Sequence, residues 1–208
     1  MSNLRAYQTV NEETGEVKDK FLYFTGMPKG YRFDARTGQF NIEGKKPLLD
    51  KKGSPVKNFT FQPISFRFFT DQMFGRERVE RWIEIFFADE RGHISAIMFN
   101  GTNVEPFETL LRTECLYEGI TLTDLVITAT PTQVTSKKDP SKSWYVVELT
   151  SDLADEEMTK QLSQFDEDFK IFRKETVNDN AVLGLVKSHY FEGVLALEPS
   201  SEKEAINQ

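Results

Sequence analysis

Hydrophobic and polar positions alternate most regularly in the central part of the chain. Short runs rich in β-branched and aromatic residues recur there, and turn-forming stretches such as Asp89 to Gly92 separate them. The β-prone runs are residues 59–70, 81–88, 94–99, 124–135 and 144–149. The pattern predicts five strands, with a longer interval between the third and the fourth.

The interval after the third run has the periodicity of a helix. Apolar positions recur at helical spacing at Val104, Phe107, Leu110, Leu111 and Cys115. Asn103 is the predicted N-cap, and Pro106 falls in the first turn, where proline is tolerated. The predicted order is three strands, a helix and two strands, and the polar loop 136–142 joins the last two.

The regions that flank this central block have different patterns. Residues 1–20 are polar and lack periodicity, which predicts a flexible lead-in. Short strands are predicted at residues 21–24, 31–33 and 40–42, with a hairpin turn at residues 34–38. The following stretch is a predicted loop with the basic residues Lys45, Lys46, Lys51, Lys52 and Lys57 against Asp50. We divide the chain into an N-terminal extension (1–57), a central block (58–152) and a C-terminal region (153–208).

A C-terminal helix is predicted from residue 153 to residue 177. Its apolar positions form a narrow stripe of Met158, Leu162, Phe165, Phe169 and Phe172. Two interpretations are open: the stripe docks on the rest of its own chain, or it pairs with a second protomer. Apolar segments at 181–186 and 190–197 predict a strand or short helix before a polar tail that begins at Pro199.

Composition and charge add two facts to this pattern. The chain has 18 Phe, 6 Tyr and 2 Trp, more rings than one core of this size needs, so some are expected to face outward. Residues 1–150 hold 20 basic and 20 acidic side chains, whereas residues 151–208 hold 6 and 13 and carry the whole net charge of −7. The acidity is thus confined to the C-terminal region.

The sequence lacks the parts that several function classes require. Two histidines, His93 and His189, stand in separate elements, and there is no paired-histidine or paired-cysteine motif, phosphate-binding glycine loop or nucleophile elbow. Cys115, the one cysteine, is interpreted as a packing residue. No stretch approaches the ~18 apolar residues of a membrane helix, and the N-terminus lacks a signal-peptide core. We expect a cytoplasmic, non-enzymatic protein with no cofactor, catalytic residue, metal site or membrane contact.

Alternation along the strands predicts which side chains face solvent. The sets expected inside are Ile64, Phe66 and Phe68; Ile83, Ile85 and Phe87; and Ile94, Ala96 and Met98. The sets expected outside are Phe61, Arg67 and Phe69; Trp82, Glu84 and Phe86; and His93, Ser95, Ile97 and Phe99. Rings on three adjacent strands would then form one outer surface. The alternative is that an extension, either residues 21–42 or the C-terminal helix, covers these rings.

The order of strands and helix over residues 58–152 resembles the OB-fold, a five-stranded Greek-key barrel. The resemblance implies a mainly β fold, with an OB-type barrel, an N-terminal β extension and a C-terminal helix. Ligands in that family cross strands two and three, between the loop after strand one and the loop that joins strands four and five. Here those loops and their edges carry Phe74, Arg76, Arg78 and Arg81, and Lys137, Lys138, Lys142 and Trp144. The predicted nucleic-acid-binding residues are these and the outer Trp82, Phe86, Phe99, Phe61, Arg67 and Phe69.

Binding to single strands requires rings on which bases stack and cations near the phosphates. A barrel with basic loops and an acidic tail also resembles bacterial and phage single-stranded DNA-binding proteins. We therefore predict a sequence-independent single-stranded DNA-binding protein of replication or recombination, from a phage or mobile element, with RNA as a second ligand to test. A homo-oligomer and replication proteins are the other expected partners. The alternatives are a protein-interaction or structural β-barrel module and a nucleic-acid enzyme with dispersed acidic residues.

Overall fold

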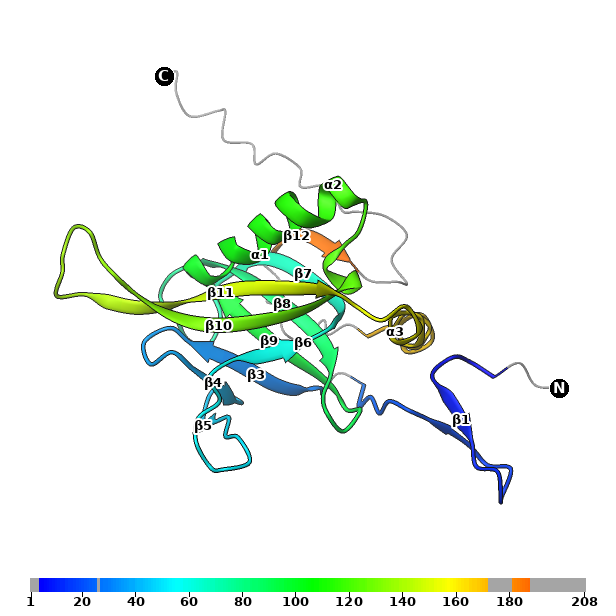
Figure 1. Ribbon diagram of the computed structural model, residues 1–208. Helices are drawn as coiled ribbons and strands as arrows, with labels where there is room; N and C mark the ends of the chain where they lie inside the picture. The colour runs from blue at the N-terminus through cyan, green and yellow to red at the C-terminus, as the bar shows by residue number, and fades with distance from the viewer. Residues whose placement is uncertain (1–3, 26, 172–180, 188–208) are drawn as a thin grey trace.

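The computed structural model describes residues 4–25, 27–171 and 181–187, and the described part is mainly β (Figure 1). The strands are β1 (Gln8–Val10), β2 (Val17–Asp19), β3 (Lys29–Asp34), β4 (Gln39–Ile42), β5 (Lys46–Pro47), β6 (Phe59–Phe61), β7 (Pro63–Asp71), β8 (Glu80–Ala88), β9 (Ile94–Asn100), β10 (Leu125–Thr135), β11 (Ser143–Leu153) and β12 (Val182–Lys187). The α-helices are α1 (Glu105–Leu110), α2 (Leu116–Glu118) and α3 (Glu156–Phe169). Two 3-10 turns, η1 (Gly101–Asn103) and η3 (Leu122–Asp124), and one π turn, η2 (Leu111–Cys115), complete the helical part.

The larger strands form two sheets that meet at one bent strand. A seven-stranded sheet has the order β12-β7-β8-β9-β3-β4-β5, and a three-stranded sheet has the order β11-β10-β6. Only Gln62 separates β6 from β7, so one continuous stretch of chain crosses from the small sheet to the large one. The α1 helix follows β9 and lies beside β11 (Figure 1). The five predicted central strands and the helix between the third and the fourth are therefore confirmed.

The two sheets are not closed into one barrel, so the structure does not confirm the OB-type barrel. The free edge of β9 is taken by β3, which pairs with it in parallel register from Lys29↔Ser95 to Arg32↔Met98. Among the described strands β11 pairs with β10 and not with β3 or β4, and its Tyr145 N–H donates to the Ala35 carbonyl of the β3–β4 turn at 2.7 Å. The N-terminal extension thus belongs to the large sheet, because it occupies an edge that would otherwise be unpaired.

The prediction of a flexible lead-in is wrong for residues 4–20. This segment contains the β1–β2 hairpin, and Tyr7 just before it is buried, with its ring edge-on to Phe165 at 5.1 Å. The buried Tyr7 ring therefore anchors a segment whose other residues are mostly exposed. The strand predicted at residues 21–24 is reduced to one bridge, Leu22↔His93, whereas the β3–β4 hairpin and its turn are confirmed.

The predicted helix between β9 and β10 is present, but its N-cap is Val104 and not Asn103. The Asn103 side chain turns instead to β11, where Oδ1 accepts from the Val147 N–H at 2.7 Å. Pro106 lies in the first turn of α1, as predicted. Asn103 is buried, and its amide satisfies a backbone group of β11 on the side where no other described strand pairs with it.

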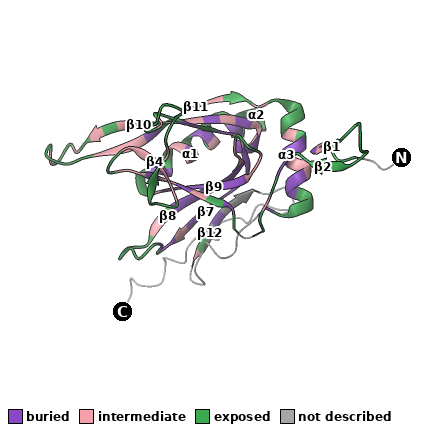
Figure 2. Ribbon diagram, turned by 90° about the horizontal axis from the view of Figure 1, so that it is seen from below, coloured by how far each residue is buried: buried purple, intermediate pink, exposed green. Residues whose placement is uncertain are grey.

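Two apolar cores lie on opposite faces of β7–β9 (Figure 2). The inner core fills the space between the sheets and α1, and Ile83, Ile85 and Phe107 are among its fully buried members. The outer core lies between the other sheet face and α3, where Phe86, Phe165 and Phe21 meet. On the same face of the sheet as the outer core, a small cluster of Phe69, Met73, Trp82 and Met98 extends toward the loop at residues 72–79. Both faces of the central sheet are therefore covered.

The strand register corrects several predicted orientations. Ile85 pairs with Ile97 and Ile83 with Phe99, and residues directly opposite each other share a face, so Ile97 and Phe99 belong to the inner core. By the same pairing Ile94, Ala96 and Met98, expected inside, lie on the outer side. Phe61 is also in the inner core and Ile64 in the outer one, and the ladder shifts register between Pro63 and Ser65. Ser95 is buried rather than exposed.

The C-terminal helix is shorter than predicted and packs on its own chain. The Asp155 carboxylate accepts from the Met158 N–H at its start, and Lys170 ends it in the left-handed conformation. Leu162 and Phe165 of the stripe are buried in the outer core, whereas Met158 and Phe169 are partly exposed. Phe172 and the rest of the helix predicted to residue 177 lie outside the described residues. None of the helices in the described ranges is long and apolar enough to cross a membrane.

Candidate nucleic-acid interface

Most of the rings predicted to stack on bases are inside the protein. Trp82, Phe86, Phe99, Phe61 and Phe69 are each at most 4% exposed, so their expected outward exposure is wrong. The reason differs by position: the register turns Phe61 and Phe99 into the inner core, whereas α3 and the loop at residues 72–79 cover the outer rings. Phe74 is 45% exposed, and Trp144 is half-buried. These two rings are the accessible members of the predicted set.

Arg67, which was predicted to face solvent, is fully buried beside Phe69. Its Nη2 donates to Glu84 Oε2 at 2.5 Å, and both side chains have no exposed surface. The Arg67 guanidinium lies 5.2 Å from the centroid of the Phe69 ring. A charge in this position serves the packing of the sheet, because its carboxylate partner is buried with it.

Three arginines from separate segments line one hollow on the surface, which we call the arginine hollow. Arg32 comes from β3, Arg36 from the β3–β4 turn and Arg76 from the loop between β7 and β8. The hollow has a volume of about 610 Å³, and Asn100 to Asn103 form part of its wall. Sequence reasoning missed Arg32 and Arg36 because they lie in a segment treated as an extension.

The β3–β4 turn holds Arg36 in place through its neighbours. Asp34 Oδ1 accepts from the Arg36 N–H at 2.9 Å, and the Asp34 carbonyl accepts from the Gly38 N–H at 2.8 Å. Gly38 has φ +69°, and a Cβ there would lie 2.6 Å from an atom of the Tyr145 ring. Only glycine fits this combination of positive φ and close approach. The Arg36 side chain is 92% exposed and accessible to a ligand, and its Nε lies 3.5 Å from Asp34 Oδ1, so Asp34 offsets part of its charge.

The loop between β7 and β8 supplies an aromatic platform at the edge of the hollow. Phe74 has φ +57°, and the Arg32 guanidinium lies 3.5 Å from the centroid of its ring. Arg76 pairs with Glu80 at 2.7 Å and lies 5.2 Å from the Trp82 ring centroid. A bulky residue with positive φ is strained, and such strain is common at functional sites.

Neutral polar side chains also line the arginine hollow. Among them is Asn41 of β4, whose buried Oδ1 has no hydrogen-bond partner among the described residues. The hollow thus combines three arginines with neutral polar side chains, and Asp34 is the acidic residue in its lining.

The loop between β10 and β11 is basic and exposed, as predicted. Lys137, Lys138 and Lys142 are all exposed, and Lys142 pairs with Asp139 at 3.0 Å. Hydrogen bonds from Ser141 and then Lys142 lower the pKa of the Asp139 carboxyl, which therefore stays ionised. One acid offsets one of three lysines, so the loop keeps a positive charge.

The lysine loop and the arginine hollow lie at the same end of the molecule. Tyr145, next to Trp144 on β11, bonds to Ala35 in the β3–β4 turn, and Thr102 of η1 lines both the hollow and the groove that contains Trp144. Figures 1 and 2 both place the tip of the β10–β11 hairpin away from α3 and β1. Of the predicted set, Arg76 lines the hollow, Phe74 stacks on Arg32 of the hollow, and the three lysines lie in the hairpin loop toward the same end.

The other two predicted arginines have different positions. Arg78 is exposed in the loop at residues 72–79. Arg81 forms an ion pair with Glu108 of α1 and lines a separate hollow of about 360 Å³ with Trp82 and Val182. Because Glu108 neutralises it, Arg81 adds less to the basic surface than its sequence position predicts.

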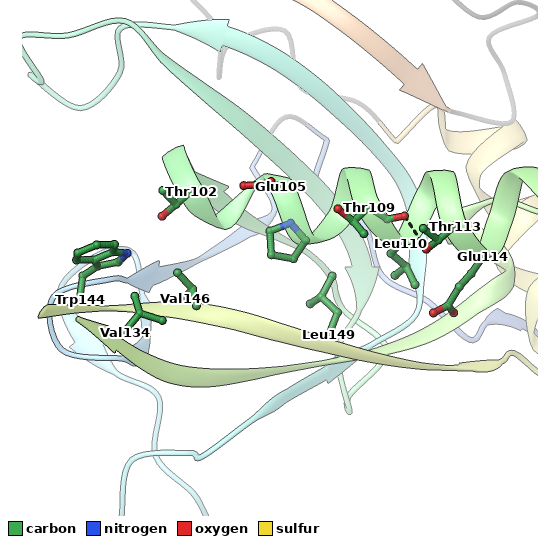
Figure 3. A pocket seen from close by; sticks show the side chains of 11 residues that line it. Thr102, Glu105, Thr109, Leu110, Thr113, Glu114, Val134, Trp144, Val146 and Leu149 are labelled. Carbon is green, nitrogen blue, oxygen red and sulfur yellow. Dashed lines mark hydrogen bonds between the residues drawn. The ribbon is translucent and has the colours of Figure 1, made fainter. Parts of the chain in front are cut away.

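Trp144 belongs to a groove between α1 and β11, which we call the helix–strand groove (Figure 3). The groove has a volume of about 600 Å³. Val146 and Leu149 project from β11 toward the helix, and Glu105 and Glu114 line the helical wall. Two carboxylates repel phosphate, so the groove is a poor path for a nucleic-acid backbone.

Potential metal ligands and the one cysteine complete the survey of chemically reactive side chains in the part of the chain that the structure describes. No three side chains of His, Cys, Asp or Glu are grouped there as metal ligands. Burial raises the pKa of the Cys115 thiol to about 11, so the thiol stays protonated and unreactive at neutral pH. Cys115 is fully buried in the inner core, which confirms its interpretation as a packing residue.

The candidate site therefore consists of the arginine hollow with Phe74 and the adjoining lysine loop. None of the protein-family models, curated proteins or solved structures compared with this chain matches it.

Proposed function

We propose that this protein binds single-stranded DNA without sequence preference, through the arginine hollow and the lysine loop. The observation that carries the proposal is the convergence of Arg32, Arg36 and Arg76 on one hollow beside the exposed ring of Phe74. A role in replication or recombination is part of the same proposal, because single strands are exposed in both processes.

The chemistry of the site suits an unpaired strand. Arginine and lysine side chains neutralise phosphates, and an aromatic ring stacks on a base of any identity. A duplex hides the faces of its bases, so a base could stack on the exposed part of the Phe74 ring, beside the Arg32 guanidinium, only in single-stranded DNA or RNA. Cations and ring faces do not distinguish one base from another, which supports binding without sequence preference.

The direct test is a titration of labelled oligo-dT at two salt concentrations, with duplex DNA and oligo-U as controls. We expect single-strand affinity that falls steeply as salt rises, because phosphate contacts release counterions. The double variant R36Q/R76Q should weaken binding and reduce the salt slope. Its matched control is K18Q/K20Q, which removes two exposed cations near the β1–β2 hairpin. Equal losses in the two variants would remove the hollow from the site.

A protein-interaction or structural module remains the second candidate function, and a specific observation favours it. Trp82, Phe69 and Phe86, which would form an outer binding surface, are used for packing within the chain. An absence of oligonucleotide binding in low salt would leave this candidate as the better one.

A further inference from the structure

We propose that the helix–strand groove binds a linear aliphatic polyamine, a small molecule with ammonium groups at both ends of a flexible chain. The proposal concerns a surface next to the nucleic-acid interface and does not depend on that interface. It rests on the sign of the charge in the groove, the separation of its two carboxylates and the apolar surface between them.

The charged side chains that line the groove are acidic. Glu105 and Glu114 line it, and no lysine or arginine is among its described lining residues. The arginine hollow and the hollow beside Trp82 contain arginines instead. Both glutamates are exposed, and Glu114 accepts from the Ser151 hydroxyl at 2.8 Å, a neutral donor that holds the carboxylate without removing its charge. The groove therefore attracts cations, in contrast to these two hollows.

The two carboxylates are separated along the helical wall of the groove. Glu114 follows Glu105 by nine positions, which corresponds to about 13 Å along a helix axis. Single bonds of about 1.5 Å advance an extended aliphatic chain by about 1.25 Å each, so about ten bonds span this distance. A short cation pairs with one carboxylate at a time, whereas a chain of this length with two terminal ammonium groups pairs with both.

The surface between the carboxylates suits a hydrocarbon chain. Figure 3 shows Val146 and Leu149 of β11 between Trp144 at one end of the groove and Glu114 at the other. Leu110 lines the helical side, and the volume of about 600 Å³ accommodates a small molecule. Methylene groups of a ligand gain free energy when they leave water for such a surface. An inorganic cation has no methylene groups, so the groove favours an aliphatic cation.

Two further side chains in the groove have chemistry that fits a polyamine. Trp144 lies at the end nearer to Glu105 (Figure 3), and the face of a tryptophan ring attracts ammonium groups. Thr109 lines the groove between the two carboxylates, four positions after Glu105 and five before Glu114. Its hydroxyl oxygen can accept a hydrogen bond from an amine in the middle of a chain. The lining thus matches terminal cations and a central nitrogen.

The test is isothermal titration calorimetry of the full chain without nucleic acid, because phosphates also bind polyamines. The probes are spermidine and octamethylenediamine, whose terminal nitrogens are about nine bonds apart. The controls are tetramethylenediamine, which is too short, and octylamine, which has one charge. We expect each probe to bind about fivefold more tightly than either control, because a second ion pair forms. Binding should also shift the emission of Trp144, and the shift should be absent in W144F.

Variants of the groove distinguish a site with two charged ends from general attraction. E105Q and E114Q should each reduce the affinity for octamethylenediamine to that for octylamine, because one ion pair remains. In E105Q/E114Q the preference for the longer diamine should disappear. The matched control E90Q/E118Q removes two exposed carboxylates outside the groove and should keep both affinity and length preference. Oligo-dT binding should be kept in E105Q/E114Q, so failure of this proposal and failure of the proposed function are distinguishable.

Several results would overturn the polyamine site. Equal affinity of the short diamine or of octylamine would show that the groove does not engage two charges. An equal loss in E90Q/E118Q would indicate attraction to the whole acidic protein, and binding without a change in Trp144 emission would place the ligand elsewhere. Failure of spermidine to bind would reject polyamines as the ligand class. Tighter binding of a tri-lysine peptide than of either probe would identify the groove as a peptide site.

Discussion

Two regions of this molecule use similar residue types in opposite ways. The outer face of β7–β9 carries Trp82, Phe69, Phe86 and the Arg67–Glu84 pair, and all of them are buried. The end formed by the lysine loop, the β3–β4 turn and the loop at residues 72–79 also combines rings and cations, but there they are exposed. Aromatic and basic composition thus indicates binding only where no other part of the chain covers it.

The difference arises from segments distant in sequence. Phe165 of α3 and Tyr7 near the N-terminus cover the outer face together, with ring centroids 5.1 Å apart. The opposite end, where polar turns meet, lies away from α3 (Figures 1 and 2). We call the outer face of β7–β9 the covered face, and the end with the lysine loop and the arginine hollow the open end. Mutations in the covered face should therefore change the stability of the protein, and mutations at the open end should change its binding.

The largest expected effect on the free energy of unfolding comes from removing a buried ring from the covered face. F165A should cost about 3 to 5 kcal/mol of unfolding free energy, because a fully buried ring is lost from the outer core. The matched control M158A, on the same helix but 41% exposed, should cost less than about 1 kcal/mol. Urea denaturation followed by far-UV circular dichroism measures both. Equal effects would show that α3 does not seal this face.

The buried ion pair should give the next largest effect. E84Q should cost about 3 kcal/mol, because the Arg67 guanidinium is left buried without its carboxylate. The double variant R67M/E84L should recover much of this loss, since both charges are removed together. Chemical denaturation of the three proteins gives the comparison. A double variant less stable than E84Q would contradict the account.

Tyr7 allows a smaller test of the covered face through pH. Its hydroxyl donates to Asp168 Oδ2 at 2.7 Å, and burial, together with this bond, raises the pKa of Tyr7 from 10.0 to about 12. The protonated phenol is favoured in the folded state, so its contribution is complete below about pH 10 and is lost between about pH 10 and 12. Y7F should cost about 1 to 2 kcal/mol at neutral pH. The difference in unfolding free energy between wild type and Y7F should shrink above pH 10, and a constant difference would refute the assignment.

The smallest effect on stability is expected at the open end. K137Q/K138Q/K142Q should change the unfolding free energy by less than about 0.5 kcal/mol, because all three side chains are exposed. The same variant should lower the slope of log affinity for oligo-dT against log salt by about 2, as three phosphate contacts are lost. K18Q/K20Q/K160Q is the control with equal charge change. An unaltered slope in the loop variant would exclude the lysine loop from the interface.

The sequence predicted side-chain exposure correctly for the loop residues of the candidate site and incorrectly for its strand residues. The loop at residues 136–142 and the stretch from Phe74 to Arg78 are exposed as expected, since turn residues and lysines have a local preference for the surface. On β9 every position from Ile94 to Phe99 is buried, so the alternation of polar and apolar residues carried no information about its faces. The register with β8 decided them, and register depends on pairing between strands.

The sequence by itself determined the central strands, the helix after β9 and the apolar stripe of α3, because these features depend on residues two to four positions apart. Only the tertiary structure decided that β3 takes the edge of β9, that α3 and Tyr7 cover the outer rings, and that Arg32, Arg36 and Arg76 share one hollow. These outcomes depend on contacts between residues tens of positions apart, for which local periodicity carries no signal. Whether a ring or a cation is available to a ligand or is buried in a core was therefore decided by which other segments cover it in the folded chain.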